Sequence, residues 1–197
     1  TCGTLPVLAD LRLMKALSNV HKVIVAVVCL VLGHAGSAQS YLGQTTKQVN
    51  LREGPGTDYQ VLRTLPQGSQ LFVVVDQVEN DFYSVVDIGS NVEGFVHRSF
   101  VKLIKILEEN REGVFTPTGR TSSNLAELEI YNRTELTLTL KLDEEIYTFR
   151  PHERTTLQVQ PRRYSYRASA PGVLPDFGSE TIDSGTAYSW QFYIVTR

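Results

Sequence analysis

Residues 49–59 read VNLREGPGTDY, and this stretch decides what kind of fold the chain begins with. Val49 and Leu51 alternate with polar residues, which is the pattern of a half-buried strand. Pro55 fits the second position of a tight turn, and Gly56 can supply the positive φ that a type II turn requires at the next position. The sequence therefore predicts that a strand ends here and that the chain turns sharply around Pro55.

Strand patterns and turn signals alternate after this point. Apolar stretches at residues 71–75 (LFVVV), 81–86 (DFYSVV) and 94–96 (GFV) are separated by polar loops, and a Pro-Gln-Gly turn at residues 66–68 precedes the first of them. From Tyr41 onward no stretch has the periodicity of a long helix. Short strands at this spacing are typical of small all-β domains.

Four motifs occur in order between residues 41 and 105: V-N-L-R-E-G-P-G-T-D-Y, then L-P-Q-G with L-F-V-V-V, then D-F-Y-S-V-V, then E-G-F-V-H. Together they resemble the bacterial SH3 domain, whose members have an N-x-R-x-G-P-G-T-x-Y opening and W-Y-K-V and G-Y-V-H strands. One position departs from the family, because Phe82 stands where its members carry Trp. The resemblance implies an SH3-like barrel over residues 41–105, with the Gly-Pro-Gly turn in the long loop after the first barrel strand.

A small barrel fills its interior with side chains, so we expect a ligand to contact loops and outward-facing rings. Phe82 and Tyr83 must point to opposite faces of their strand, and we expect Tyr59 and Phe82 to be the outward pair. The resemblance implies that such rings cradle peptide segments, including the cross-bridges of peptidoglycan. The candidate binding residues are Tyr59, Phe82, Phe95 and His97, with Gly54, Pro55 and Gly56 forming the turn at the site.

The first 38 residues have the pattern of a secretory signal peptide. A basic pair precedes the apolar run VIVAVVCLVL at residues 23–32, and Gly36 and Ala38 are small residues at the −3 and −1 positions for cleavage. The run of ten residues is shorter than the ~20 that a membrane-spanning helix needs. We expect translation to start at Met14, with residues 1–13 upstream of it, and the exported chain to be periplasmic or extracellular.

Cleavage after Ala38 would remove both cysteines, Cys2 and Cys29, so the exported chain would contain no thiol and no disulfide. Its stability would then depend on packed cores alone. Cleavage would also remove three of the 19 basic side chains and one of the 21 acidic ones, which leaves 16 and 20 and a formal net charge of −4 in place of −2. This mild acidity argues against a general nucleic-acid binder, which needs a basic surface.

A second group of strand patterns follows a change in composition. Residues 106–125 are rich in Glu, Asn, Gly, Thr and Ser with little periodicity, so we expect a linker there. In residues 135–142 (ELTLTLKL) leucines alternate with threonine and lysine, as in a strand with one buried face. We therefore predict an all-β chain in which a small antiparallel β-sandwich, residues 126–197, follows the barrel. This part resembles small β-domains of exported bacterial proteins, without a diagnostic motif.

Arginine and tyrosine are interleaved at residues 161–167, PRRYSYR. In a strand, Arg163 and Ser165 share one face and the two tyrosines share the other. Such a surface can recognise a sugar, a phosphate or an acidic partner. Alternatively, this is an exposed strand whose arginines prevent edge-to-edge pairing. The surface candidates of the second module are Arg163, Tyr164, Tyr166 and Arg167.

The predicted exported chain lacks the groups that hydrolytic catalysis needs. No cysteine remains for the Cys-His wall peptidases that often accompany bacterial SH3 domains, and the chain has no G-x-S-x-G elbow and no phosphate loop. Only His97 and His152 remain, and neither has a second His or Cys at metal-ligand spacing. The acidic run at residues 143–145 fits a solvated hairpin turn. We expect no enzyme activity, no metal and no cofactor.

These observations favour a non-catalytic binding protein of the bacterial envelope, whose SH3-like domain docks on a peptide or on peptidoglycan. A chain with the docking module of a wall hydrolase but without its catalytic groups could instead inhibit or regulate such enzymes. A structural part in an envelope or surface complex is the third alternative. We expect no nucleic-acid partner and no membrane span in the exported chain.

Overall fold

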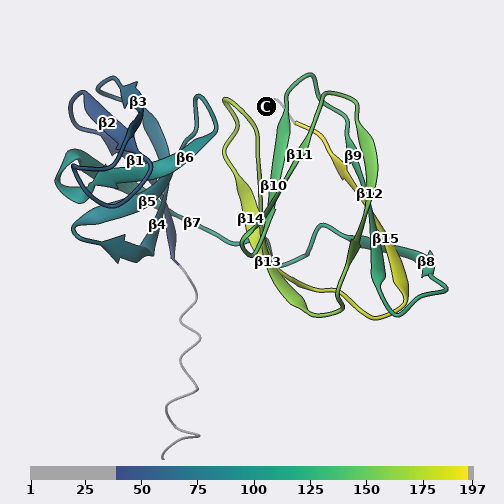
Figure 1. Cartoon of the computed structure of the whole chain (residues 1–197). Helices are drawn as coiled ribbons and strands as arrows, with labels where there is room; N and C mark the ends of the chain where they lie inside the picture. The colour runs from purple at the N-terminus through teal and green to yellow at the C-terminus, as the bar shows by residue number, and fades with distance from the viewer. Residues whose placement is uncertain (1–38, 195–197) are drawn as a thin grey trace, which may run out of the picture. The chain divides into compact units, whose positions relative to one another are not determined.

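The structure is a computed structural model that describes residues 39–194, which form strands, turns and loops and one short 3₁₀ helix, η1 (Arg98–Phe100). The predicted signal peptide, the predicted start residue and the last three residues of the chain lie outside the described residues. The fold class is the predicted one, because a barrel is followed by a sandwich of two sheets (Figure 1).

Seven strands, all paired antiparallel, form the barrel in the order β3-β2-β6-β5-β4-β1-β7. They are β1 (Ser40–Thr45), β2 (Val49–Arg52), β3 (Val61–Leu65), β4 (Gln70–Glu79), β5 (Phe82–Asp87), β6 (Val92–His97) and β7 (Val101–Leu107). Alternate side chains of these strands point inward and make one core. Its buried members are Val49, Leu51, Leu65, Leu71, Val73, Val85 and Val96.

Two four-stranded sheets form the sandwich, in the orders β11-β10-β13-β14 and β12-β9-β15-β8. Their strands are β8 (Thr116–Arg120), β9 (Ala126–Asn132), β10 (Leu138–Leu142), β11 (Glu145–Phe149), β12 (Arg154–Val159), β13 (Arg163–Ser169), β14 (Asp176–Thr181) and β15 (Thr186–Phe192). The leucines of β10 are buried between the sheets and alternate with half-exposed residues, as predicted. Neighbouring strands are antiparallel except β9 and β15, which are parallel.

Strands β4 and β5 are apolar on both faces because both faces are covered. Phe72 and Val86 point away from the barrel core and pack with Ile88, Leu107 and Phe177 of β14. The rings of Phe72 and Phe177 meet edge to face, with centroids 5.1 Å apart. This explains the continuous run LFVVV, since a strand with one solvated face would alternate.

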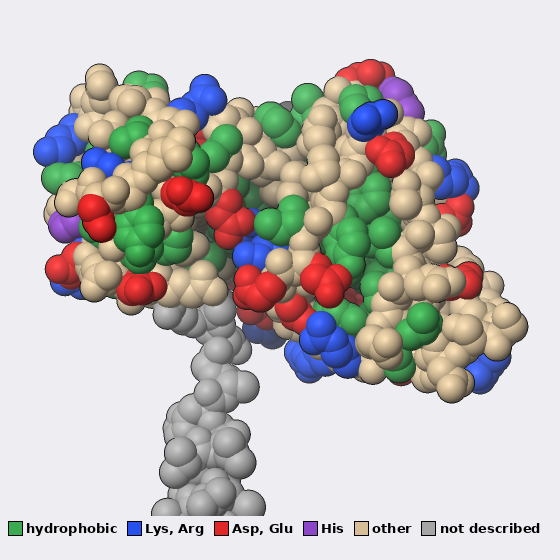
Figure 2. All heavy atoms as spheres, in the orientation of Figure 1, with side chains coloured by type: hydrophobic (Ala, Val, Ile, Leu, Met, Phe, Trp, Pro, Cys, Tyr) green, Lys and Arg blue, Asp and Glu red, His purple; other side chains and the backbone are tan. Residues whose placement is uncertain are grey.

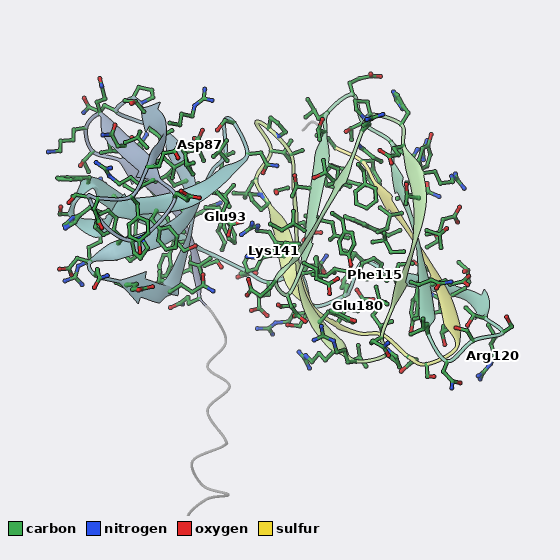
Figure 3. All side chains as sticks on the ribbon, in the orientation of Figure 1. Asp87, Glu93, Phe115, Arg120, Lys141 and Glu180 are labelled. Carbon is green, nitrogen blue, oxygen red and sulfur yellow. The ribbon has the colours of Figure 1, made fainter. Side chains whose placement is uncertain are left out.

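The segment that we expected to be a linker, residues 106–125, takes part in the fold. Asn110 forms a bridge with β14, and Phe115 is buried in the sandwich core. The backbone N–H groups of Val114 and Phe115 donate to the carboxylate of Glu180 at 2.9 and 3.2 Å (Figure 3). Backbone pairing and a single ring hold this segment, and neither leaves a periodic pattern in the sequence. Whether the barrel and the sandwich are separate folding units stays a prediction.

An ion pair links strands that are distant in sequence. Glu93 of β6 accepts from Arg167 of β13 at 2.5 Å and lies 3.4 Å from the Nζ of Lys141 of β10 (Figure 3). Burial alone would raise the pKa of Glu93, but the charges and hydrogen bonds of Arg167 and Lys141 outweigh it and lower that pKa. The Arg167 side chain is only 13% exposed, so Glu93 is the counter-charge that its burial requires.

Candidate ligand-binding surface

The Gly-Pro-Gly turn forms a seat for the ring of Tyr59. A Cβ atom added at Gly54 would lie 2.3 Å from Cδ1 of this ring, and one at Gly56 would lie 2.5 Å from Oδ1 of Asp58 and 3.2 Å from Cδ2 of the ring. Neither glycine has a positive φ, so the prediction that Gly56 adopts one is wrong. The turn needs glycine for space, because the ring occupies the volume of a side chain at Gly54 and the Asp58 carboxylate, with the ring edge behind it, occupies that volume at Gly56. Tyr59 remains 45% exposed on this seat.

Three hydrogen bonds hold the turn in place. Arg52 donates from Nη1 to the carbonyl oxygen of Tyr59 at 2.8 Å, and the backbone N–H of Glu53 donates to the carbonyl oxygen of Gln60 at 3.0 Å. Asn80, in the loop between β4 and β5, donates from Nδ2 to the carbonyl oxygen of Pro55 at 3.3 Å. The arginine of the opening motif therefore closes the loop that carries Tyr59.

Three rings form a row where β5 begins and β6 and η1 end, which we call the ring row: Phe82, His97 and Phe100. The centroids of Phe82 and His97 are 5.1 Å apart, and those of His97 and Phe100 are 5.4 Å apart. Phe82 does point away from the barrel core, opposite Tyr83, as predicted, but it is only 6% exposed. The expectation that Phe82 offers an exposed ring is wrong, because neighbouring groups, His97 among them, cover it.

The outer members of the ring row are polar or carry a charge beside them. His97 accepts the backbone N–H of Ser99 at Nδ1, 3.3 Å away, so a neutral His97 carries its proton on Nε2. Lys47 places its Nζ 3.9 Å from the centroid of Phe100, within the range of a cation–π contact. The row thus passes from a buried ring to a half-exposed imidazole and a half-exposed ring with a cation beside it.

The turn and the ring row belong to one surface, which we call the rim. Asn80 binds the turn, and its neighbour Asp81 accepts the backbone N–H of Arg98 at 2.8 Å and pairs with the Arg98 guanidinium at 2.6 Å. Phe95 is half-exposed and pairs with Arg52 across the strands, beside the turn. The structure therefore brings all the predicted barrel residues together: Tyr59, Phe82, Phe95, His97 and the turn at Gly54, Pro55 and Gly56.

The second-module candidates do not form a surface of arginine and tyrosine. Tyr164 and Tyr166 are 6% and 3% exposed and lie in the sandwich core, so the expectation that they are surface groups is wrong. Arg167 is engaged by Glu93, and Arg163 alone of the four is exposed. The alternation of faces was predicted correctly, but β13 lies between β10 and β14, so the idea of an exposed edge strand is also wrong.

Sequence reasoning missed the rim residues that are not aromatic. Lys47, Asn80 and Arg98 have no distinctive spacing, and each acts through a contact with a residue distant in the chain or in a neighbouring loop. Within residues 39–194 no group of three or more His, Cys, Asp or Glu side chains could hold a metal ion. No helix in that range combines the length and the hydropathy needed to cross a bilayer.

The sequence of the barrel has a known counterpart. The family model described as the bacterial SH3 domain matches residues 47–102, which run from Lys47 of the rim into β7 and include no part of the sandwich. No curated protein and no solved structure matches the chain. The match confirms the predicted resemblance, and a domain of this family indicates a binding role. The chain thus carries, at residues 47–102, a bacterial SH3 domain that contains the whole rim.

Proposed function

We propose that this chain is an exported, non-catalytic binding protein of the bacterial envelope, and that its rim docks on an extended peptide of the cell wall, a stem or cross-bridge of peptidoglycan. The observation that carries the proposal is the seat of Tyr59. Two glycines leave the space for this ring, and Arg52 and Asn80 fix the loop around it, yet the ring stays 45% exposed. A ring that is held in place but left open is arranged for contact with something outside the chain.

The rim combines groups that suit an extended peptide. Aromatic rings that are already fixed can pack along a stiff, extended chain at little entropic cost. The rim also presents charges of both signs, with Lys47 and Arg98 near His97 and Asp81 beside them. Peptides of the cell wall carry both amines and carboxylates, so a surface of mixed charge fits them better than one of a single sign.

The location in the envelope rests on the sequence. The pattern of residues 1–38 predicts export, and both cysteines of the chain lie in that segment. A chain that works outside the cytoplasm without disulfides depends on well-packed cores, and the barrel and the sandwich each have one. The absence of catalysis is proposed on the same basis, since residues 39–194 contain no cysteine for a Cys-His pair.

A retention experiment with purified sacculi tests this proposal. The full chain and two variants are incubated with sacculi and sedimented: Tyr59→Ala removes the exposed ring of the rim, and Ile146→Ala removes an exposed apolar side chain of β11 (59% exposed) as a matched control. We expect retention of the wild-type chain and of Ile146→Ala, and about tenfold weaker retention of Tyr59→Ala, the loss expected when a contact residue of an interface is truncated.

Circular dichroism establishes that each variant is folded before its retention is compared. The proposal is rejected if the folded wild-type chain is not retained. The assignment of the rim is rejected if the wild-type chain and Tyr59→Ala are retained equally. Release of wall fragments by the purified chain alone would contradict the absence of catalysis.

A further inference from the structure

On one side of the sandwich the edges of its two sheets face each other, and we call the gap between these edges the seam. Residues of the chain fill only part of the seam. The seam runs between β14, at the edge of one sheet, and β15 with β8 in the other. Residues 110–116 cross it: Asn110 bridges to β14, Phe115 inserts its ring into the core, and Thr116 pairs with β15. This segment shows how an extended stretch of chain fits the seam, with backbone pairing at the edges and one ring inside.

Beside this segment the seam opens into a cleft of about 720 Å³. That volume is within the range of roughly 300–1,000 Å³ that ligand sites occupy. Its walls include Leu174 and Asp176 on one side and Trp190, Phe192 and Tyr193 on the other. Hydrophobic side chains show at the surface of the sandwich between its two sheets in Figure 2.

One wall of the cleft is a strand edge without a partner strand. β8 pairs with β15 only as far as Ser189, whereas β9 pairs with the other edge of β15 as far as Phe192. The carbonyl oxygen of Phe192 accepts from Arg133, on the β9 side. Because backbone groups alternate in direction along a strand, those of Gln191 point away from β9 and toward the cleft. Within the described residues no strand pairs with them there.

The cleft also holds a carboxylate that lacks a counter-charge. Asp176 is half-buried, and within residues 39–194 its one side-chain hydrogen-bond partner is Asn110, which donates from Nδ2 at 3.4 Å. Burial raises the pKa of Asp176, and the hydrogen bonds from Asn110 and from the backbone of Phe177 offset this only in part. In the part of the chain that the structure describes, no lysine or arginine pairs with Asp176. A cation brought by a ligand would supply what this carboxylate lacks.

We propose that this cleft binds an extended peptide segment, which adds a strand to the free edge of β15 and places a lysine amine on Asp176. The free edge supplies the backbone hydrogen bonds that any extended peptide can use. Leu174 and Tyr193, which are exposed and line the cleft, select an apolar neighbour of that lysine, and Asp176 selects its charge. The cleft and the rim share no residue, so a test of peptide binding by the cleft is independent of a test of wall binding by the rim.

Trp190 reports directly on the cleft, because it lines the cleft and is the only tryptophan of the chain. The probe is the synthetic peptide acetyl-Val-Thr-Lys-Thr-Val-amide, titrated into the full chain while Trp190 fluorescence is recorded. Two matched peptides serve as controls: one has Glu in place of Lys, and the other has N-methyl groups on alternate backbone amides. We expect a saturable change with the lysine peptide and at least about tenfold weaker binding of each control, because the first loses the charge pair and the second its strand hydrogen bonds.

Variants locate the site. Asp176→Asn should weaken binding of the lysine peptide by about fivefold to tenfold, the value of one charge-assisted contact. Glu144→Gln removes a carboxylate of the sandwich whose side chain is 90% exposed and which does not line the cleft, and it should leave the affinity unchanged. Thermal unfolding of both variants confirms that they are folded.

Three results would overturn the proposal. The first is a Trp190 signal that does not respond to the lysine peptide. The second is equal affinity for the N-methylated peptide, which would exclude strand addition. The third is dimerisation in sedimentation that depends on protein concentration and is lost in Asp176→Asn, because a second copy of the chain would then be the occupant.

Discussion

The barrel and the sandwich both present aromatic side chains, but they hold them in different ways. In the barrel the core is filled, and Tyr59 lies outside it on a turn whose glycines make room for its ring. In the sandwich Trp190 and Phe192 lie between two sheets, beside a part of the β15 edge with which no strand of residues 39–194 pairs. The surface around Tyr59 is specified by a few consecutive residues of the turn. The cleft beside β15 depends instead on which strands pair with each other. Sequence motifs can therefore identify the first and not the second.

The largest effect should come from two glycines, one in each region, where backbones approach closely. A Cβ at Gly94 would lie 2.5 Å from the carbonyl oxygen of Arg52, and one at Gly178 would lie 2.4 Å from that of Asn110. We expect Gly94→Ala and Gly178→Ala each to lower the free energy of unfolding by about 2–4 kcal/mol, because the backbone must move. Chemical denaturation measures this.

Gly119→Ala is the matched control, since no atom lies within 4 Å of the added Cβ and the φ of Gly119 is not positive. It should change stability by no more than about 0.5 kcal/mol. If Gly178→Ala were equally harmless, Asn110 would not pair with β14, which would favour the linker predicted over residues 106–125.

A smaller loss is expected from Glu93→Gln, which leaves the nearly buried Arg167 without its counter-charge. We expect a loss of about 1–3 kcal/mol at neutral pH. Because the folded-state pKa of Glu93 is lowered, its stabilising contribution is complete above the ordinary pKa of a glutamate and is lost as pH falls through the folded-state pKa. Unfolding curves at pH 7 and at pH 3 should therefore show a smaller difference between wild type and variant at the lower pH. A difference that grows on acidification would contradict this.

The seat of Tyr59 predicts an effect on binding with little effect on stability. In Gly54→Ala the added methyl group displaces the ring of Tyr59, which can swing into solvent. We expect retention on sacculi to fall about as far as in Tyr59→Ala, and the double variant to be no worse than either, because both remove one contact. Additive losses would mean that Gly54 acts in some other way.

The smallest stability effect is expected at Asp176. Since burial raises its pKa, the charged form costs stability at neutral pH, and that cost disappears as pH falls through the raised pKa. Asp176→Asn should therefore leave the melting temperature unchanged or slightly higher at pH 7, while it weakens peptide binding. A clear destabilisation would show that Asp176 serves the fold rather than a ligand.

Strand patterns and turn signals were sufficient to predict the fold class, and the resemblance of four motifs to the bacterial SH3 domain predicted the barrel. The leucines of β10 alternate with polar residues because only one face of that strand is buried. The apolar run of β4 is continuous because other side chains cover both of its faces. The parallel pairing of β9 with β15 could not be predicted. An apolar pattern shows which face of a strand is buried, but it does not show which strand lies beside it.

For the candidate binding residues, the sequence predicted strand faces but not exposure, and their role in binding stays a prediction. Alternation correctly placed Phe82 and Tyr83 on opposite faces, yet it could not show that His97 and its surroundings cover Phe82. The same limit applies to Tyr164 and Tyr166. The prediction that they share one face of the strand was correct, but it did not show that this face is buried. Exposure depends on what packs on a face, and that information comes from segments distant in the sequence.

The central claim is that the rim of the barrel binds a peptide of the cell wall. Its most direct test is a nuclear magnetic resonance titration of the ¹⁵N-labelled chain with a soluble peptidoglycan stem peptide. We predict that the backbone amide signals of Gly54, Gly56, Asn80 and Ser99 shift and saturate together, while those of β11 do not move. An unchanged spectrum at saturating peptide, or shifts confined to the sandwich, would contradict the claim.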